Sequence, residues 1–474
     1  MNKILLLISM IAFIPMSYGA IPADAVWEMR STTGDNTNGA CVDKSVVAGT
    51  TDYSQQAAAQ LSLTDLATTG AAVTTLTSAT GGFTSQMVGN CLRINSGTNA
   101  TVGYYMITAY TDTNTVTLDR APDDAVGGVA SGAGKVGGAT ASIDSQTTST
   151  LADALIGGNI IYIKNEAGWS ENITIGVGYI AWVGYNSTRT DAPTGSDRPV
   201  LDLNSGAGDA IVTTAGGQFL QNLIIREAGG DCLGHGASYI GTGFHLINTR
   251  LSTCGAAGVS SNNYRRAWVG LYYSEIDGCT TSATNMYQGN NEGKVFSIGS
   301  DIHGNAGGLR GGAITAYFNN IYDNTADGIW TSGHGHILFA NTIDGNTGVG
   351  VDGISATGGG TVNIISNNIM SNNGGYGLRF SSAISYEPLE SLIDYNDYYL
   401  NASGTVDNGT PNTHSLTLNP TFTDADNGDF SIGTNLKAKG FSDFPAGTST
   451  GYLDLGAVQR EESGGATEHS YTFS

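Results

Sequence analysis

The segments IHGN at Ile302–Asn305, IYDN at Ile321–Asn324 and IDGN at Ile343–Asn346 decide the fold of this chain. Each begins with an isoleucine and ends, three places later, with an asparagine. Apolar anchors of this kind recur at Ile225, Leu251, Ile276, Ile302, Ile321, Ile343 and Ile369. The steps between them are 26, 25, 26, 19, 22 and 26 residues. A period of about 20 to 50 residues with one apolar face per unit is typical of stacked coils.

Two further columns follow the anchors. Three places after them stand small residues and then asparagines, at Ala228, Cys254, Cys279, Asn305, Asn324, Asn346 and Asn372. A second apolar residue comes four to six places later, except in the unit of Cys279, at Leu233, Val259, Leu309, Ile329, Val351 and Leu378. The units are too short for helix pairs and too rich in Gly, Asn, Thr and Ile for leucine-rich repeats. They predict an all-β fold, a parallel β-helix, whose asparagines stack about 4.8 Å apart and exchange side-chain hydrogen bonds.

Composition and charge limit the partners. The chain has 474 residues, of which 68 are glycine and only 13% are charged, and this fits a turn-dense β protein. Its formal net charge of −22 repels nucleic acid and anionic membranes. We therefore expect no nucleic-acid partner and no membrane insertion.

The first nineteen residues have the features of a secretory signal peptide. Lys3 precedes an apolar run from Ile4 to Phe13, Pro15 follows it, and the small residues Ser17 and Gly19 suit signal peptidase. The run is short for a membrane span. We expect residues 1–19 to be removed and the mature protein to be secreted, either extracellular or at the cell surface; a buried N-terminal strand is the alternative.

Five cysteines in an exported chain leave at least one unpaired. Cys254 and Cys279 occupy the same position in successive coils, so their spacing suits a disulfide, and Cys41 with Cys91 is a second candidate pair. Free cysteines that stack as small core residues are the alternative. With Cys232 as the fifth, the pairing stays open.

Residues 20–145 lack the coil pattern. Alternating segments separated by polar turns predict a small antiparallel β module there, at Val88–Ile94, Tyr104–Ala109 and Thr115–Leu118. The Gly- and Ala-rich segment Gly127–Ala141 is expected to be a linker. Beyond it, Thr148 or Ser149 is predicted to cap a short helix, Leu151–Leu155, that plugs the open end of the solenoid.

Several segments carry a resemblance to known families. The N-terminal part, from VWEMRSTTGDNTNGACV at Val26–Val42 to GYYMITAYTDTNTVTLDRAP at Gly103–Pro122, resembles a leader module of phage and environmental structural β-helix proteins. The short helix, IIYIK at Ile160–Lys164, ENITI at Glu171–Ile175 and the Ile/Asn coils together resemble the secreted right-handed parallel β-helix proteins of the pectate-lyase-like superfamily.

The far end of the chain is similar to the closing segment of many bacterial members of that superfamily. It reads LNPTFTDADNGDFSIG at Leu418–Gly433 and DLGAVQ at Asp454–Gln459, although Asn435-Leu436-Lys437 replaces the usual Ser-Pro-Ala. The resemblance implies a right-handed β-helix of about eight to ten coils over residues 146–410, a C-terminal β cap over 411–460 and a flexible tail over 461–474. It does not identify an activity, because the superfamily includes lyases, hydrolases, epimerases, adhesins and tailspikes.

The residues on either side of each anchor should face solvent. The column before the anchors is Arg250, Glu275, Asp301, Asn320, Thr342 and Asn368. The column after them is Ser252, Asp277, His303, Tyr322, Asp344 and Met370. One polar patch within these columns supplies the candidate catalytic residues, which are Glu275, Asp277, Asp301, His303, Tyr322 and Asp344. Its carboxylates should lie about 5 Å apart between coils and about 7 Å apart along a strand.

Such spacings suit glycoside hydrolysis, in which one carboxylic acid protonates the leaving oxygen and a second carboxylate activates water or attacks. Crowding raises the proton affinity of at least one carboxyl group, as a general acid requires. The same oxygens could hold Ca²⁺. A plain solvated face is the alternative.

A second outward column follows the second apolar positions, at Gly234, Ser260, Arg310, Trp330, Asp352 and Arg379. Arg310, Trp330, Asp352 and Arg379 are the candidate substrate-binding residues, because an indole ring stacks on a sugar face and guanidinium groups bind hydroxyls or carboxylates. Packing of Trp330 under a loop is the alternative.

Two functions remain open from the sequence. One is binding, with or without hydrolase or lyase cleavage, of extracellular polysaccharide along one face of the solenoid. The other is a non-enzymatic surface, filament or tailspike-like role, for which a homotrimer is a candidate state. If the catalytic patch lines a walled cleft with Arg310 or Trp330 in reach, the enzyme is favoured; an open face favours binding or structure.

Overall fold

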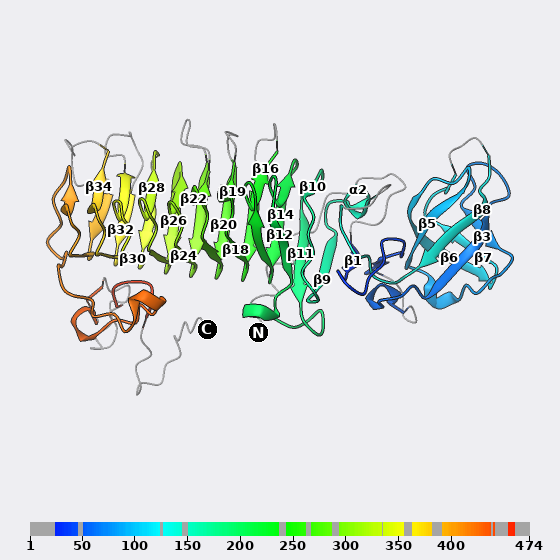
Figure 1. The fold of residues 1–474 in the computed structure, drawn as a ribbon, viewed down its shortest axis with the longest axis horizontal. Helices are drawn as coiled ribbons and strands as arrows, with labels where there is room; N and C mark the ends of the chain where they lie inside the picture. Colours follow the sequence, from blue (N-terminus) through cyan, green and yellow to red (C-terminus); the bar gives the residue numbers. More distant parts are fainter. Residues whose placement is uncertain are drawn as a thin grey trace. The chain divides into compact units, whose positions relative to one another are not determined.

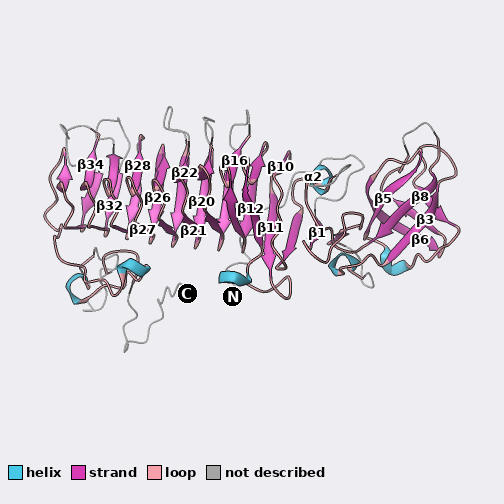
Figure 2. Cartoon of the chain, in the orientation of Figure 1, coloured by secondary structure: helices cyan, strands magenta, loops and turns pink. Residues whose placement is uncertain are grey.

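The computed structural model describes residues 24–45, 51–123, 127–144, 150–236, 243–261, 267–286, 293–333, 335–354, 363–381, 391–437, 439–440 and 454–459. The chain divides into an N-terminal unit, Met1–Leu203 with Ala210–Ile224, and a C-terminal unit, Asn204–Asp209 with Ile225–Ser474. Strands dominate both units (Figures 1 and 2). The predicted signal peptide, residues 1–19, and the predicted tail, residues 461–474, lie outside the described residues. None of the helices in the described part of the chain is long and apolar enough to cross a membrane.

The N-terminal unit contains a closed antiparallel barrel, which confirms the predicted small β module. Its strands run in the order β3-β4-β7-β6-β5-β8 and comprise β3 (Leu61–Ala67), β4 (Thr75–Ser78), β5 (Cys91–Thr98), β6 (Gly103–Asp112), β7 (Thr115–Leu118) and β8 (Ala130–Val136). Two 3-10 helices, η2 (Tyr53–Gln55) and η3 (Ser85–Met87), accompany it. Leu66, Leu76, Leu92 and Ile107 fill its core.

The predicted linker Gly127–Ala141 is wrong, because β8 lies within it and pairs with both β3 and β5. The small residues of this segment allow neighbouring strands to approach closely; they do not form a loose linker. A Cβ atom added at Gly134 would lie 2.8 Å from the carbonyl oxygen of Arg93. Glycine lets the barrel close at this point.

The same unit holds the first parallel strands. β1 (Ala25–Met29) pairs antiparallel with β2 (Cys41–Asp43) and parallel with β9 (Ile160–Lys164), so residues 25–29 join a parallel sheet although they precede the barrel. The other strands are β10 (Ile173–Ile175), β11 (Ile180–Tyr185), β12 (Val200–Gly206), β13 (Ile211–Thr213) and β14 (Gly217–Gln221), with η4 (Gly195–Asp197). The short helix α2 (Leu151–Ala154) is capped by Thr150 in a capping box with Asp153, and not by Thr148 or Ser149, which lie outside the described residues.

The C-terminal unit is a parallel β-helix, as predicted. Sheet I comprises β17 (Gly243–Ile247), β20 (Trp268–Tyr272), β23 (Lys294–Ile298), β26 (Ala313–Tyr317), β29 (Ile337–Phe339), β32 (Asn363–Ser366) and β35 (Ser391–Asp394). Sheet II comprises β15 (Ile224–Ala228), β18 (Arg250–Ser252), β21 (Glu275–Asp277), β24 (Asp301–His303), β27 (Asn320–Tyr322), β30 (Thr342–Asp344), β33 (Ile369–Ser371) and β36 (Asp397–Tyr399).

Two shorter parallel sheets complete the coils. Sheet III comprises β16 (Leu233–His235), β19 (Ala257–Ser260) and β22 (Ser282–Asn285). Sheet IV comprises β25 (Leu309–Gly311), β28 (Ile329–Thr331), β31 (Val351–Ile354), β34 (Tyr376–Phe380) and β37 (Gly404–Asp407). In the unit of Cys279, which lacks the second apolar residue, Thr284 pairs with Val259 and is buried.

The anchors stack as predicted over most of sheet II. Leu251, Ile276, Ile302, Ile321 and Ile343 are direct partners in successive strands, and all are fully buried. At the next coil the prediction is wrong by one residue, since Ile343 pairs with Met370 and not with Ile369. The outward positions of that coil are consequently Ile369 and Ser371, in place of Asn368 and Met370.

The predicted asparagine ladder exists and continues through Asn373. The side-chain amide of Asn305 donates to Asn324 at 3.1 Å, Asn324 to Asn346 at 2.9 Å, and Asn346 to Asn373 at 3.0 Å. Asn372 is exposed and binds Asp344 instead. A second ladder, which the sequence analysis missed, joins Asn319, Asn341, Asn368 and Asn396 between sheets I and II.

Connection lengths differ between the corners of the coil. Every connection from sheet I to sheet II has two residues, such as 248–249 and 318–319, and its first residue has a positive φ, as at Asn248 (47°) and Phe318 (55°). Connections back to sheet I run from one residue, Gly312 between β25 and β26, to ten, residues 381–390. The shortest coil, between Ile302 and Ile321, contains the one-residue connection.

Two disulfides are present. The Cys41–Cys91 pair is confirmed, but Cys254 pairs with Cys232 and not with Cys279. Cys232 and Cys254 are both buried at the corner between sheets II and III, with Cα atoms 5.4 Å apart. Cys279 is free and buried, and burial raises the pKa of its thiol to about 12.

The segment after β37, predicted as a β cap, forms turns and two 3-10 helices, η6 (Ala425–Asn427) and η7 (Thr434–Leu436), in its described residues. Ile432, Leu436 and Leu455 pack on Ile369 at the outward side of sheet II. In its described residues, the segment therefore covers later strands of sheet II.

Candidate functional site

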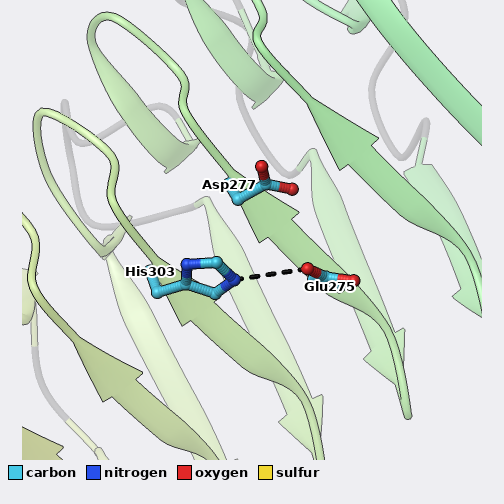
Figure 3. Close-up of side chains that lie close together, drawn as sticks. All are labelled: Glu275, Asp277 and His303. Atoms are coloured by element: carbon cyan, nitrogen blue, oxygen red, sulfur yellow. Dashed lines mark hydrogen bonds and ion pairs between the residues drawn. The ribbon is translucent and has the colours of Figure 1, made fainter. Parts of the chain in front are cut away.

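Sheet II brings together four of the predicted catalytic side chains, namely the group of Glu275, Asp277 and His303, and Tyr322, which stacks on His303 from the next strand. Glu275 and Asp277 flank the buried Ile276 on β21, and His303 follows the buried Ile302 on β24 (Figure 3). Because side chains alternate along a strand, all three project outward. One polar atom from each lies within 4.8 Å of the others, and all three are half-buried.

Glu275 and Asp277 share Arg250 as an ion-pair partner, at 3.5 Å from Glu275 Oε1 and 2.8 Å from Asp277 Oδ1, and each has further partners of its own. His303 Nε2 lies 3.3 Å from Glu275 Oε1. Arg250 donates two hydrogen bonds to Asp277, of 2.8 and 3.1 Å, and Ser252 donates a third of 3.0 Å. Asp277 is thus held in place by three donors, whereas Glu275 lies against an imidazole ring that can donate to it.

The imidazole of His303 is fixed from its other side by aromatic rings. Tyr322 stacks on it with centroids 4.8 Å apart and an interplanar angle of 14°, and Phe430 from the C-terminal segment packs against Tyr322 at 4.9 Å. Partial burial lowers the pKa of His303, but the contact with Glu275 and the surrounding carboxylates outweigh it, so its pKa is raised. Burial first, and then those carboxylates, raise the pKa of Tyr322 to about 12.

The other two predicted catalytic residues, Asp301 and Asp344, lie in register on sheet II, and Asp301 is the direct strand partner of Glu275. Asp301 is exposed and accepts a hydrogen bond of 2.9 Å from Asn320. Asp344 is buried and accepts hydrogen bonds from Ser371 and Asn372. Burial, above all, raises the pKa of Asp344. It binds its own neighbours and is withdrawn from solvent.

The patch does not fit a calcium ion. Calcium takes six to eight oxygen ligands, but both oxygens of Asp277 are bound by Arg250, and the third group is a histidine nitrogen. A guanidinium group beside the carboxylates also repels a cation. We derive no step through a metal.

The second outward column stacks on sheet IV as expected. Arg310 pairs with Trp330, and Trp330 with Asp352, in successive strands. The guanidinium carbon of Arg310 lies 5.1 Å from the centre of the Trp330 ring. Arg379 donates two hydrogen bonds of 2.7 and 2.6 Å to the buried carboxylate of Asp352.

A surface pocket of about 470 Å³ opens at this column. Three of the four predicted substrate-binding residues line it, namely Trp330, Asp352 and Arg379. Arg310 does not; it lies against the Trp330 ring and positions it. The sequence analysis missed Phe380, at the end of the same strand as Arg379, and Asn408, which follows β37. The alternation along β34 assigns Phe380 to the inward side with Leu378, so the sequence offered no signal for it, and the position of Asn408 depends on the turn that ends β37.

The two groups project from different sheets. Glu275 and His303 belong to sheet II, and Trp330 and Arg379 belong to sheet IV. Among the contacts of the described residues, neither Arg310 nor Trp330 touches Glu275 or His303. The pocket at Trp330 is lined by none of the predicted catalytic residues. This arrangement favours a binding site at sheet IV over a single walled catalytic cleft.

No protein-family model and no curated protein matches this chain. Among solved structures, pectate lyase Pel9A is similar with 14% identity and a TM-score of 0.44, covering 66% of this chain and 92% of that one. A mutant of the periplasmic alginate epimerase AlgG (13%, TM-score 0.29) covers 56% of this chain and 77% of that one. The catalytic domain of a GH87 α-1,3-glucanase with nigerose (12%, TM-score 0.27) covers 75% and 86%. At these values nothing about the site follows.

Proposed function

We propose that this protein binds polysaccharide in the sheet IV pocket. The pocket at Trp330 is the observation that carries the proposal. It combines an aromatic ring, a buried carboxylate and an arginine that is partly exposed, with Asn408 at the rim. A sugar ring stacks on an indole face, while its hydroxyls need donors and acceptors at the ring's edge.

The charges of the pocket indicate which groups a glycan would meet. Asp352 accepts hydrogen bonds from two N–H groups of Arg379. The remaining N–H groups of the guanidinium are available to hydroxyl or carboxylate oxygens. Arg310 holds the Trp330 ring by a cation–π contact on a single face. The ring is therefore fixed before a ligand arrives, and this reduces the entropy cost of binding.

Calorimetric titration with a panel of neutral glucans, pectins and alginates tests the proposal. We expect a saturable ligand in the panel and an affinity about tenfold weaker for Trp330→Ala, which is roughly 1.4 kcal/mol. Tyr110→Ala, at an exposed aromatic position of the barrel, is the matched control and should bind like the wild type. No binding across the panel, or equal binding by Trp330→Ala, would contradict the proposal.

Cleavage at the sheet II patch is a second candidate function. It is supported by the Glu275–His303 contact beside Asp277, because that arrangement places an imidazole and two carboxyl groups within reach of one substrate atom. Reducing-end and unsaturated-product assays with the same glycans test it. Turnover that is lost in both Glu275→Gln and His303→Ala but retained in Asn320→Ala would support it. If the wild type shows no turnover, polysaccharide binding without cleavage is the function that remains.

We also propose that the protein is secreted. The features of residues 1–19 and the two disulfides support this, since disulfides persist in oxidising compartments. N-terminal sequencing of protein from the culture medium should find a chain that begins near Ala20 or Ile21. A chain retained in the cytoplasm with Met1 intact would count against secretion.

A further inference from the structure

Four aromatic side chains form a stripe on the outward side of sheet I. Tyr272, Phe296, Tyr317 and Phe339 belong to the consecutive strands β20, β23, β26 and β29, and we call them the aromatic stripe. Each alternates with buried residues on its strand and is itself only half-buried. Neighbouring centroids lie 5.7, 6.3 and 6.4 Å apart, so the rings make one continuous surface.

The strand positions beside the aromatic stripe, among the described residues, are mostly apolar and carry little charge. Its flanking outward positions are Ile298, Thr315, Ile337 and Ile364. Lys294 is the one charged residue among the outward positions of the four strands that carry the stripe. This face therefore carries far less charge than the chain as a whole, whose net charge is −22.

The geometry points to a second copy of this chain as the partner, and we propose that the aromatic stripe is a self-association surface. Two chains of the same strongly negative charge repel each other, and this repulsion is least where they meet through an uncharged face. Aromatic residues with aliphatic neighbours are also what the centres of protein interfaces contain. The stripe has one ring per coil, so a second stripe can align with it coil by coil.

The ring angles favour a protein partner over a glycan. Successive rings are tilted by 46°, 60° and 54°, so they form ridges and not one flat platform. Ridged apolar surfaces interdigitate with each other, whereas a sugar chain stacks on ring faces. The isoleucines between the rings offer a glycan no hydrogen bond.

Sedimentation velocity of the mature chain over a range of concentrations tests this proposal. We expect the wild type to associate, and Phe296→Lys to associate at least tenfold more weakly, since it places a charge in the contact. Tyr110→Lys adds the same charge at an exposed position of the barrel and should not change association. If Phe296→Lys unfolds at lower temperature, Thr315→Lys charges the middle of the stripe and keeps every ring.

Three results would overturn the proposal. The first is a monomeric wild type at every concentration. The second is association that neither Phe296→Lys nor Thr315→Lys weakens. The third is loss of glycan binding in the stripe variants with association unchanged, which would assign the face to a glycan. Trp330→Ala should leave association intact, so failure here and failure of the sheet IV proposal are distinguishable.

Discussion

His303 lies between a carboxylate and an aromatic ring, and each neighbour has a different effect on it. Glu275 stabilises the imidazolium form, whereas Tyr322 and Phe430 fix the ring plane. The raised pKa of His303 means that the folded state binds a proton more tightly than the unfolded chain. Its contribution to stability is therefore complete below the unfolded pKa and is lost as the pH rises through the folded value.

Removal of the Glu275 charge should lower the pKa of His303. In Glu275→Gln the largest favourable contact of the imidazolium is lost, while the burial that opposes protonation remains. NMR titration of the His303 ring protons, assigned with His303→Ala, measures the change. Asn320→Ala is the control, since Asn320 binds Asp301 and does not contact the imidazole. An unchanged or higher pKa in Glu275→Gln would show that Glu275 does not stabilise the charged form.

Single residues also mark where prediction from sequence succeeded and failed. Ile302, Ile321 and Ile343 were placed correctly, because one isoleucine stood at a clear spacing from one asparagine. The next coil reads Ile-Met-Ser-Asn-Asn, which offers two apolar residues and two asparagines. Only the hydrogen bond from Asn346 to Asn373 decides between these registers. The sequence alone therefore shifted the outward columns by one residue there.

Other features of the site depend on contacts between distant segments. Phe430 packs on Tyr322 from more than a hundred residues away, and no spacing in the sequence indicates it. The aromatic stripe was visible as alternating residues on sheet I, but its strands are separated by connections of variable length. Correct alignment of Tyr272, Phe296, Tyr317 and Phe339 required the register of the coils.

Among the elements, the asparagine ladder contributes directly to stability. Asn373 donates to Ile343 O at 3.1 Å and accepts from both the backbone and the side chain of Asn346. Asn373→Ala would leave these buried groups without partners, so we expect a loss of about 2 to 4 kcal/mol in unfolding free energy. Urea denaturation measures it.

The matched control for the ladder is Asn372→Gly. Asn372 is exposed and has a φ of 54°, which glycine adopts without strain. We expect a change of less than about 1 kcal/mol, from loss of the hydrogen bond to Asp344. A larger loss for Asn372→Gly than for Asn373→Ala would mean that the ladder runs through Asn372 after all.

The C-terminal segment covers the carboxyl group of Asp397 but donates a hydrogen bond to one of its two oxygens. Asp397 on β36 is fully buried, accepts a hydrogen bond of 2.7 Å from Leu418 N, and has no partner for its second oxygen among the described residues. Burial raises its pKa to about 7. The unfolded chain ionises near pH 4, so stability falls as the pH rises from there to about 7.

Asp397→Asn should remove this pH dependence. The amide can keep the Leu418 contact without a buried charge, so we expect a higher melting temperature at pH 8 and little change at pH 4. The gain is at most about 4 kcal/mol, from 1.36 kcal/mol per pKa unit. Calorimetric melting at both pH values measures it, with Asp24→Asn, at an exposed carboxyl group, as the control. Equal effects at both pH values would show that Asp397 is not buried in its charged form at pH 8.

For the molecule as a whole, the redox state should set the stability of the solenoid. Cys232 and Cys254 close a loop of 22 residues across the corner of a coil, for which the chain-entropy relation gives about 3 kcal/mol. Replacement of both by serine should lower the unfolding free energy by about this amount. Cys279→Ser is the control, since it removes no cross-link.

Thiol labelling checks the same assignment. Because burial raises the pKa of Cys279 to about 12, iodoacetamide at neutral pH should not modify the folded, non-reduced protein. After unfolding without reductant, mass spectrometry should find one label, at Cys279. Labels at Cys232 or Cys254 would contradict the pairing.

The unequal corners of the coil indicate where this protein can acquire new sequence. The two-residue corner between sheets I and II fixes the ladder of Asn319, Asn341, Asn368 and Asn396, so an insertion there would break the stacking of every later coil. The opposite corner already accommodates from one to ten residues. Foreign peptides grafted at that corner, as at 381–390, should leave the scaffold intact, and lineages of this protein should diverge in length there first.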